Sequence, residues 1–143
     1  MELIANIEKI TTWYKSLKRD FAGVNDLMYA RQQLSGLLAD VAIQIASLVE
    51  QRNGCEFQRK AAHAGILRRE MANQGTSAAA AKIIADNEIA DFLERECQAE
   101  TEYQKARLLY DAWRNICDTM SQHISTLKQE RSAEYSGRGS QNV

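Results

Sequence analysis

The chain has 143 residues, a formal net charge of −1 and a hydrophobic fraction of 45%. Such a nearly neutral protein does not coat nucleic acid or an anionic membrane by bulk charge, so any contact of that kind must come from a local patch. At this length we expect one modest hydrophobic core and no large enclosed active-site cavity. The chain has no proline and is rich in helix-forming residues. This composition predicts an all-α fold.

The cysteines indicate a reducing compartment. Cys55, Cys97 and Cys117 show neither CxxC spacing nor an even number, and neither a signal peptide nor a long apolar span precedes them. We therefore expect a cytoplasmic protein with no membrane partner.

A short helix is predicted at the start of the chain, within residues 1–22. Apolar residues recur there at spacings of three and four, which gives one apolar stripe. They are Leu3, Ile7, Ile10, Tyr14 and Leu17. Asp20, Gly23 and Asn25 then mark a break.

Residues 23–134 are predicted to form a long antiparallel helical hairpin with its turn near residues 73–77. The first arm carries nearly heptad-spaced apolar residues, namely Leu27, Leu34, Leu38, Val41, Ile45 and Leu48. Asn53-Gly54 predicts a kink or a local weakening within this arm, and whether it breaks the helix is left open. Gly75 is a C-terminal helix signal, and Thr76 and Ser77 are suited to cap the next helix.

The second arm is predicted to run as one helix from Ala78 to about Ala133. Its apolar stripe consists of Ala106, Leu109, Trp113, Ile116, Met120, Ile124 and Leu127. An extended hairpin leaves such stripes exposed, so we expect the helices to assemble into a homo-oligomer. Residues 135–143 have no periodicity and contain two glycines, which predicts a disordered tail.

Catalytic and metal-binding patterns are lacking in the sequence. His63 and His123 have no recurring carboxylate, Cys or His partner at ligand spacing, and the sequence contains no phosphate-binding loop or activated nucleophile. We therefore expect that the protein is not an enzyme and uses no cofactor or metal.

The charges are unevenly distributed along the chain. Five basic residues and one acid lie between residues 51 and 69, and seven acids lie between residues 86 and 102. Folding the hairpin about Gly75 brings Arg59 and Lys60 opposite residues 90–91, and Arg52 opposite residues 96–100. Pairing across the arms is therefore one explanation of these basic residues. Near the turn, Arg68, Arg69 and Lys82 have only Glu70 as an acidic neighbour within residues 64–85. This cationic tip is a candidate phosphate-binding surface.

Several segments between residues 28 and 135 carry distinctive runs of residues. The basic-leaning first arm ends in Ile-Leu-Arg-Arg-Glu-Met at residues 66–71, and Gly-Thr-Ser-Ala-Ala-Ala-Ala-Lys follows at residues 75–82. The second arm contains Glu-Tyr-Gln-Lys-Ala-Arg-Leu-Leu-Tyr-Asp-Ala-Trp at residues 102–113, then Ile-Cys-Asp-Thr-Met at residues 116–120 and a charged end at residues 128–131. With these segments the chain resembles the UvsY-like family of phage and prophage recombination mediators.

The resemblance implies a non-enzymatic mediator encoded by a phage or prophage and active in the cytoplasm of a bacterial host. Such a protein binds single-stranded DNA and forms a ring-like homo-oligomer. It helps to load or stabilise a recombinase or annealing protein in place of single-strand-binding protein. The matching DNA-binding positions are Arg59, Lys60, Arg68 and Arg69, to which the charge of the tip adds Lys82.

An alternative interpretation from another class is a helical adaptor or assembly scaffold that does not bind DNA. Such a protein needs exposed apolar stripes but has no need of an unneutralised cationic tip. The basic tip therefore distinguishes the two interpretations.

Overall fold

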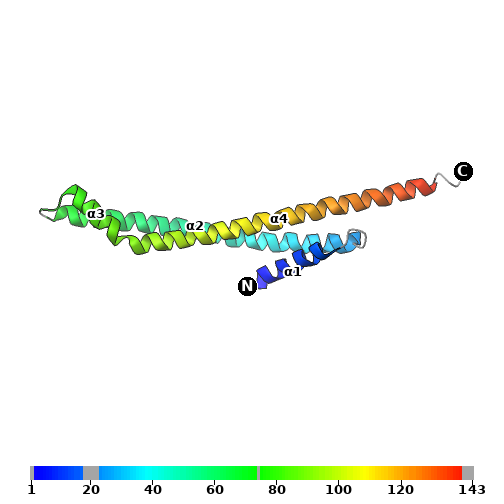
Figure 1. The fold of residues 1–143 in the computed structure, drawn as a ribbon, viewed down its shortest axis with the longest axis horizontal. Coiled ribbons are helices and arrows are strands. Elements are labelled where there is room, and N and C mark those ends of the chain that lie inside the picture. Colours follow the sequence, from blue (N-terminus) through cyan, green and yellow to red (C-terminus); the bar gives the residue numbers. More distant parts are fainter. Residues whose placement is uncertain (1, 18–22, 74, 140–143) are drawn as a thin grey trace. The chain divides into compact units, whose positions relative to one another are not determined.

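The computed structural model describes residues 2–17, 23–73 and 75–139, and every regular element within these ranges is a helix. The helices are α1 (Glu2–Ser16), α2 (Val24–Ala72), α3 (Ala78–Glu88) and α4 (Ala90–Gly139) (Figure 1). The predicted all-α class is confirmed, with a short N-terminal helix followed by long helices that pack against each other.

The chain divides into two compact units. The first unit comprises residues 1–42 and 108–143, and the second comprises residues 43–107. Both long helices contribute to each unit, because α2 and α4 extend through the residues at which the division falls.

The core of the first unit is built from α1, the start of α2 and the later part of α4. Ile7, Leu27, Leu34 and Met120 are its largest fully buried side chains. The cluster of Val24, Leu27 and Ile124 packs against Tyr14, Leu17 and Leu127. Thus the predicted N-terminal stripe packs against both long helices through Tyr14 and Leu17.

This packing corrects the reason given above for self-association. Leu34, Val41, Trp113 and Met120 were expected to need a second copy to cover them, yet all four are buried within the first unit. Leu109 was placed on the inward stripe, but its side chain is 44% exposed. The half-buried Tyr110 takes the inward position instead.

The second unit has a thin apolar core. Its buried side chains in the described part of the chain are Ala81, Ala85, Ile89 and Ala99. The heptad pattern of α2 continues inward through Ile45, Leu48, Arg52, Cys55, Arg59, Ala62 and Ile66, and each of these residues is only half-buried. In the second unit, Arg52 and Arg59 therefore occupy positions of the inward heptad pattern, the seam, where α2 of the first unit has leucine or valine.

Residues 73–77 separate α2 from α3. Gly75 has a φ of +96°, a conformation that glycine adopts at little cost. The Ser77 hydroxyl caps α3 by accepting a hydrogen bond from the Ala80 amide at 3.1 Å. Residue 74 lies outside the described ranges.

The second arm is two helices and not the single one predicted, because the α-helix is interrupted at Ile89. That residue has φ −87° and ψ 6°, and its amide donates to the Ala85 carbonyl at 3.2 Å. Buried Ala81, Ala85 and Ile89 are four residues apart, and steps of four rotate the buried face by about 40° each. Ile89 is nevertheless buried at the point where the two helices meet.

Asn53-Gly54 does not break the first arm, and the predicted start of the tail was wrong. α2 is helical through Asn53-Gly54, because one glycine costs only about 1 kcal/mol within a long packed helix. α4 continues to Gly139, although a tail was predicted from Tyr135. No proline interrupts this segment, and residues 140–143 of the predicted tail lie outside the described ranges.

Length and composition alone allow one described helix to cross a membrane. α2 contains an 18-residue window with a mean hydropathy of 1.2, of which 17% is buried. The core helix of a soluble protein passes the same test, so this property is weak evidence for a membrane span.

Candidate functional site

The basic residues of the first arm lie against acidic residues of α4. Arg59 pairs with Glu96, and both side chains are about three-quarters buried. Arg52 pairs with Glu100 at 3.4 Å, and its guanidinium carbon lies 4.5 Å from the centre of the Tyr103 ring. Cross-arm pairing is therefore present. Arg52 pairs within the expected stretch 96–100, whereas the partner of Arg59 is Glu96 and not a residue at positions 90–91.

Lys60 pairs within its own helix. Its ammonium group contacts Glu56 one turn away at 2.5 Å, and both side chains are exposed. This hydrogen bond to Lys60 is the main cause that lowers the pKa of Glu56, and the nearby guanidinium groups lower it further. Glu56 is therefore ionised at neutral pH and offsets the charge of Lys60.

The tip is less cationic than its sequence predicted. Arg69 pairs with Glu70 at 3.1 Å and with both oxygens of Glu88 at 2.8 and 2.9 Å. These hydrogen bonds, with that to Glu88 the largest cause, raise the pKa of Arg69. Glu88 was missed because the neighbourhood of the turn was taken to end at Ala85, whereas α3 folds back along the end of α2 (Figure 1).

Arg68 and Lys82 retain unneutralised charge. Both side chains are exposed, and neither has a carboxylate partner within the described ranges. Arg68 donates only to the Ala64 carbonyl of its own helix, at 3.4 Å. Of the five predicted DNA-binding residues, these two have the charge most available to a phosphate.

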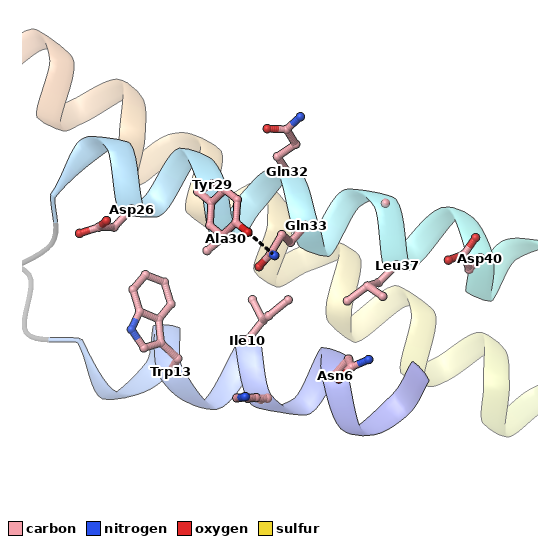
Figure 2. A pocket seen from close by; sticks show the side chains of 12 residues that line it. Asn6, Ile10, Trp13, Asp26, Tyr29, Ala30, Gln32, Gln33, Leu37 and Asp40 are labelled. Atoms are coloured by element: carbon pink, nitrogen blue, oxygen red, sulfur yellow. Dashed lines mark hydrogen bonds between the residues drawn. The ribbon is translucent and has the colours of Figure 1, made fainter. Parts of the chain in front are cut away.

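A groove of about 920 Å³ lies between α1 and the start of α2 within the first unit. Figure 2 shows Ile10 and Trp13 of α1 directed toward α2, while Asp26 and Asp40 lie toward the two ends of the groove. The Gln33 amide donates to the Tyr29 hydroxyl at 2.9 Å on its wall. The lining is open and mixed in character: Lys9, Asp26 and Asp40 lie among apolar and amide side chains, and no cysteine, histidine or serine belongs to it.

The histidines and cysteines differ in their surroundings: Cys117 is buried, Cys55 is half-buried and Cys97 is exposed. His63 lies 2.9 Å from Asp86, and the His123 ring packs near Tyr14 with a centroid distance of 6.1 Å. Burial raises the pKa of the Cys117 thiol, which disfavours the reactive thiolate. No cluster of three metal-ligating side chains occurs among the residues whose placement is described.

Comparisons with known proteins returned no similar sequence or fold. Neither the family models, nor the curated proteins, nor the solved structures contain a match to this chain.

Proposed function

We propose that this protein is a non-enzymatic recombination mediator of the UvsY-like type. It binds single-stranded DNA as a homo-oligomer and helps to load a recombinase or annealing protein where single-strand-binding protein would otherwise be bound. The proposed DNA contact rests on two exposed basic side chains, Arg68 and Lys82, which lie on the two sides of the turn. Neither has a carboxylate partner among the residues that the structure describes.

Two basic side chains in one subunit form only a weak DNA-binding site. Repeating this site in several subunits of an oligomer compensates for the weak affinity. A ring of subunits places several tips along one strand, and linked weak contacts raise the overall affinity well above that of a single contact. Because such contacts are with phosphates, the binding tolerates any base sequence and weakens with salt. Because one subunit alone binds weakly, self-association is part of the proposed function.

A helical adaptor without DNA binding is the second candidate, and a specific observation favours it. Arg59, Lys60 and Arg69 all have carboxylate partners, so three of the five candidate contacts are already neutralised. An adaptor would instead act through its exposed apolar side chains.

A fluorescence anisotropy titration of labelled single-stranded DNA, repeated at two salt concentrations, separates the two candidates. We expect binding by the wild-type chain, with an affinity that falls steeply with salt. The combined change Arg68→Ala and Lys82→Ala weakens binding and reduces the slope of log affinity against log salt by roughly 0.7 for each phosphate contact removed.

The matched control is the combined change Arg59→Ala and Lys60→Ala, which also removes two positive charges. We expect it to alter DNA affinity less, because these side chains are paired with Glu96 and Glu56. Absence of DNA binding by the wild-type chain at low salt would contradict the mediator proposal and favour the adaptor. Equal losses for both variants would extend the DNA surface down the first arm.

A further inference from the structure

The last turns of α4 carry an exposed tyrosine among basic side chains. Every residue from 128 to 139 is exposed, and Tyr135 is 78% exposed. At about 100° of rotation per residue, four positions in this segment fall within about 80° of one another around the helix axis. They are Lys128, Arg131, Tyr135 and Arg138, and we name them the tyrosine face.

The tyrosine face continues the inward stripe of α4 past the hydrophobic core. Cys117 and Ile124 are buried, and Arg131 and Arg138 follow them at the same seven-residue spacing. Residues separated by seven lie on nearly the same side of a helix. The side of α4 that is buried at Ile124 therefore presents charge over its last turns. Such a surface does not suit an apolar helix, because burying an unpaired guanidinium group is costly.

The basic side chains of the tyrosine face are not neutralised by carboxylates. None of the three forms an ion pair in the part of the chain that the structure describes. Of the two acids in the same turns, Glu130 lies on the far side of the helix and Glu134 lies at the edge of the face. A shallow hollow of about 220 Å³ is lined by Arg131, Glu134, Tyr135 and Arg138. With three basic residues and one acid at its edge, the face is cationic.

An accessible ring among unpaired cations suits a strand of unpaired nucleotides. A base stacks on the ring, and the guanidinium groups beside it attract the phosphates that flank the base. Every base has a face that can stack, so this contact is compatible with binding that tolerates any sequence. In a duplex the base faces are covered by their neighbours, so the ring favours single strands.

We propose that the tyrosine face is a second contact for single-stranded DNA, in which a base stacks on Tyr135 while phosphates approach Arg131 and Arg138. This inference rests on the proposed function and deepens it. The tip offers charge to phosphates, whereas the tyrosine face adds a contact with the bases.

Anisotropy titrations with two labelled oligonucleotides of equal length test this contact. One is oligo(dT), and the other is the same sugar–phosphate chain without bases. The wild type should bind oligo(dT) more tightly, because only this strand has bases to stack. Tyr135→Ala should lower the affinity for oligo(dT) by about fivefold or more and leave the affinity for the abasic strand unchanged. Tyr135→Phe retains the ring and should keep most of the wild-type preference.

Phe57→Ala is the matched control, because it removes another exposed ring. Phe57 is 73% exposed, and its basic neighbours Arg59 and Lys60 are already paired with carboxylates. This change should alter neither affinity. Glu134→Gln should have the opposite effect to Tyr135→Ala: it removes the acid at the edge of the face and should tighten the binding of oligo(dT) at low salt.

The outcomes separate this contact from the tip. Equal binding of the two strands by the wild type, or a preference for oligo(dT) that survives Tyr135→Ala, would overturn the tyrosine face and leave the tip standing. A loss for Tyr135→Ala, with none for the combined change Arg68→Ala and Lys82→Ala, would support the tyrosine face and overturn the tip. Wild-type binding of neither strand at low salt would overturn both.

Discussion

At the scale of single residues, the two tryptophans have different positions. Trp113 is 7% exposed and belongs to the core of the first unit, whereas Trp13 is 37% exposed and lines the groove beside α1. An aromatic ring that binds nucleic-acid bases must be accessible. Trp113 is therefore assigned to packing.

Trp113→Ala should destabilise the protein by about 3–5 kcal/mol, because it leaves a cavity where a large buried ring was. Urea denaturation followed by circular dichroism measures this change. Trp13→Ala provides the comparison and should cost clearly less. If Trp113→Ala kept its stability and mass but lost DNA binding, the ring would be a stacking platform.

Gly75 and Gly65 should respond in opposite directions to alanine. Gly75 has a positive φ that an L side chain rarely adopts, so Gly75→Ala should destabilise by about 1 kcal/mol. Gly65 is helical, and a Cβ there meets no atom within 4 Å. Gly65→Ala should stabilise by about 0.5–1 kcal/mol. Thermal melting of both variants checks the pair, and the same sign for both would contradict the assigned turn.

At the scale of helices, the first unit relies on apolar burial and the second on a partly polar seam. Arg59 and Glu96 occupy seam positions, and each side chain is about a quarter exposed. Partly buried ion pairs add little net stability compared with apolar residues, but like charges in their place are costly. The pair therefore favours one register of α2 against α4.

Exchanging the two charges tests this role. Arg59→Glu and Glu96→Arg should each destabilise the protein by about 1–2 kcal/mol, after allowance for partial exposure, since each places like charges together. The double exchange should recover most of the loss. Denaturant midpoints of the four proteins give the coupling energy, and additive losses in the double variant would show that the pair has no register role.

The sequence was sufficient to predict helices, the inward stripe of the first arm and the position of the turn, because these depend on local spacing and on glycine and serine chemistry. It did not reveal the interruption at Ile89, because neither proline nor glycine lies at or next to this position. It also missed the Arg69–Glu88 pair, because the partner lies beyond a turn whose path the local pattern does not specify.

At the scale of the whole molecule, the proposed function needs two surfaces in each subunit. One is the tip, where Arg68 and Lys82 offer charge to phosphates, and the other is a surface that joins subunits. Neither surface requires an enclosed pocket or a catalytic group. The weak charge of a single tip means that the proposed DNA affinity depends on assembly.

The most direct test of this account is the mass of the wild-type chain mixed with a short single-stranded DNA, measured by light scattering after size fractionation. We predict one particle that contains several subunits and the DNA, and that loses the DNA as salt rises. A monomer that elutes apart from the DNA at low salt would contradict the account.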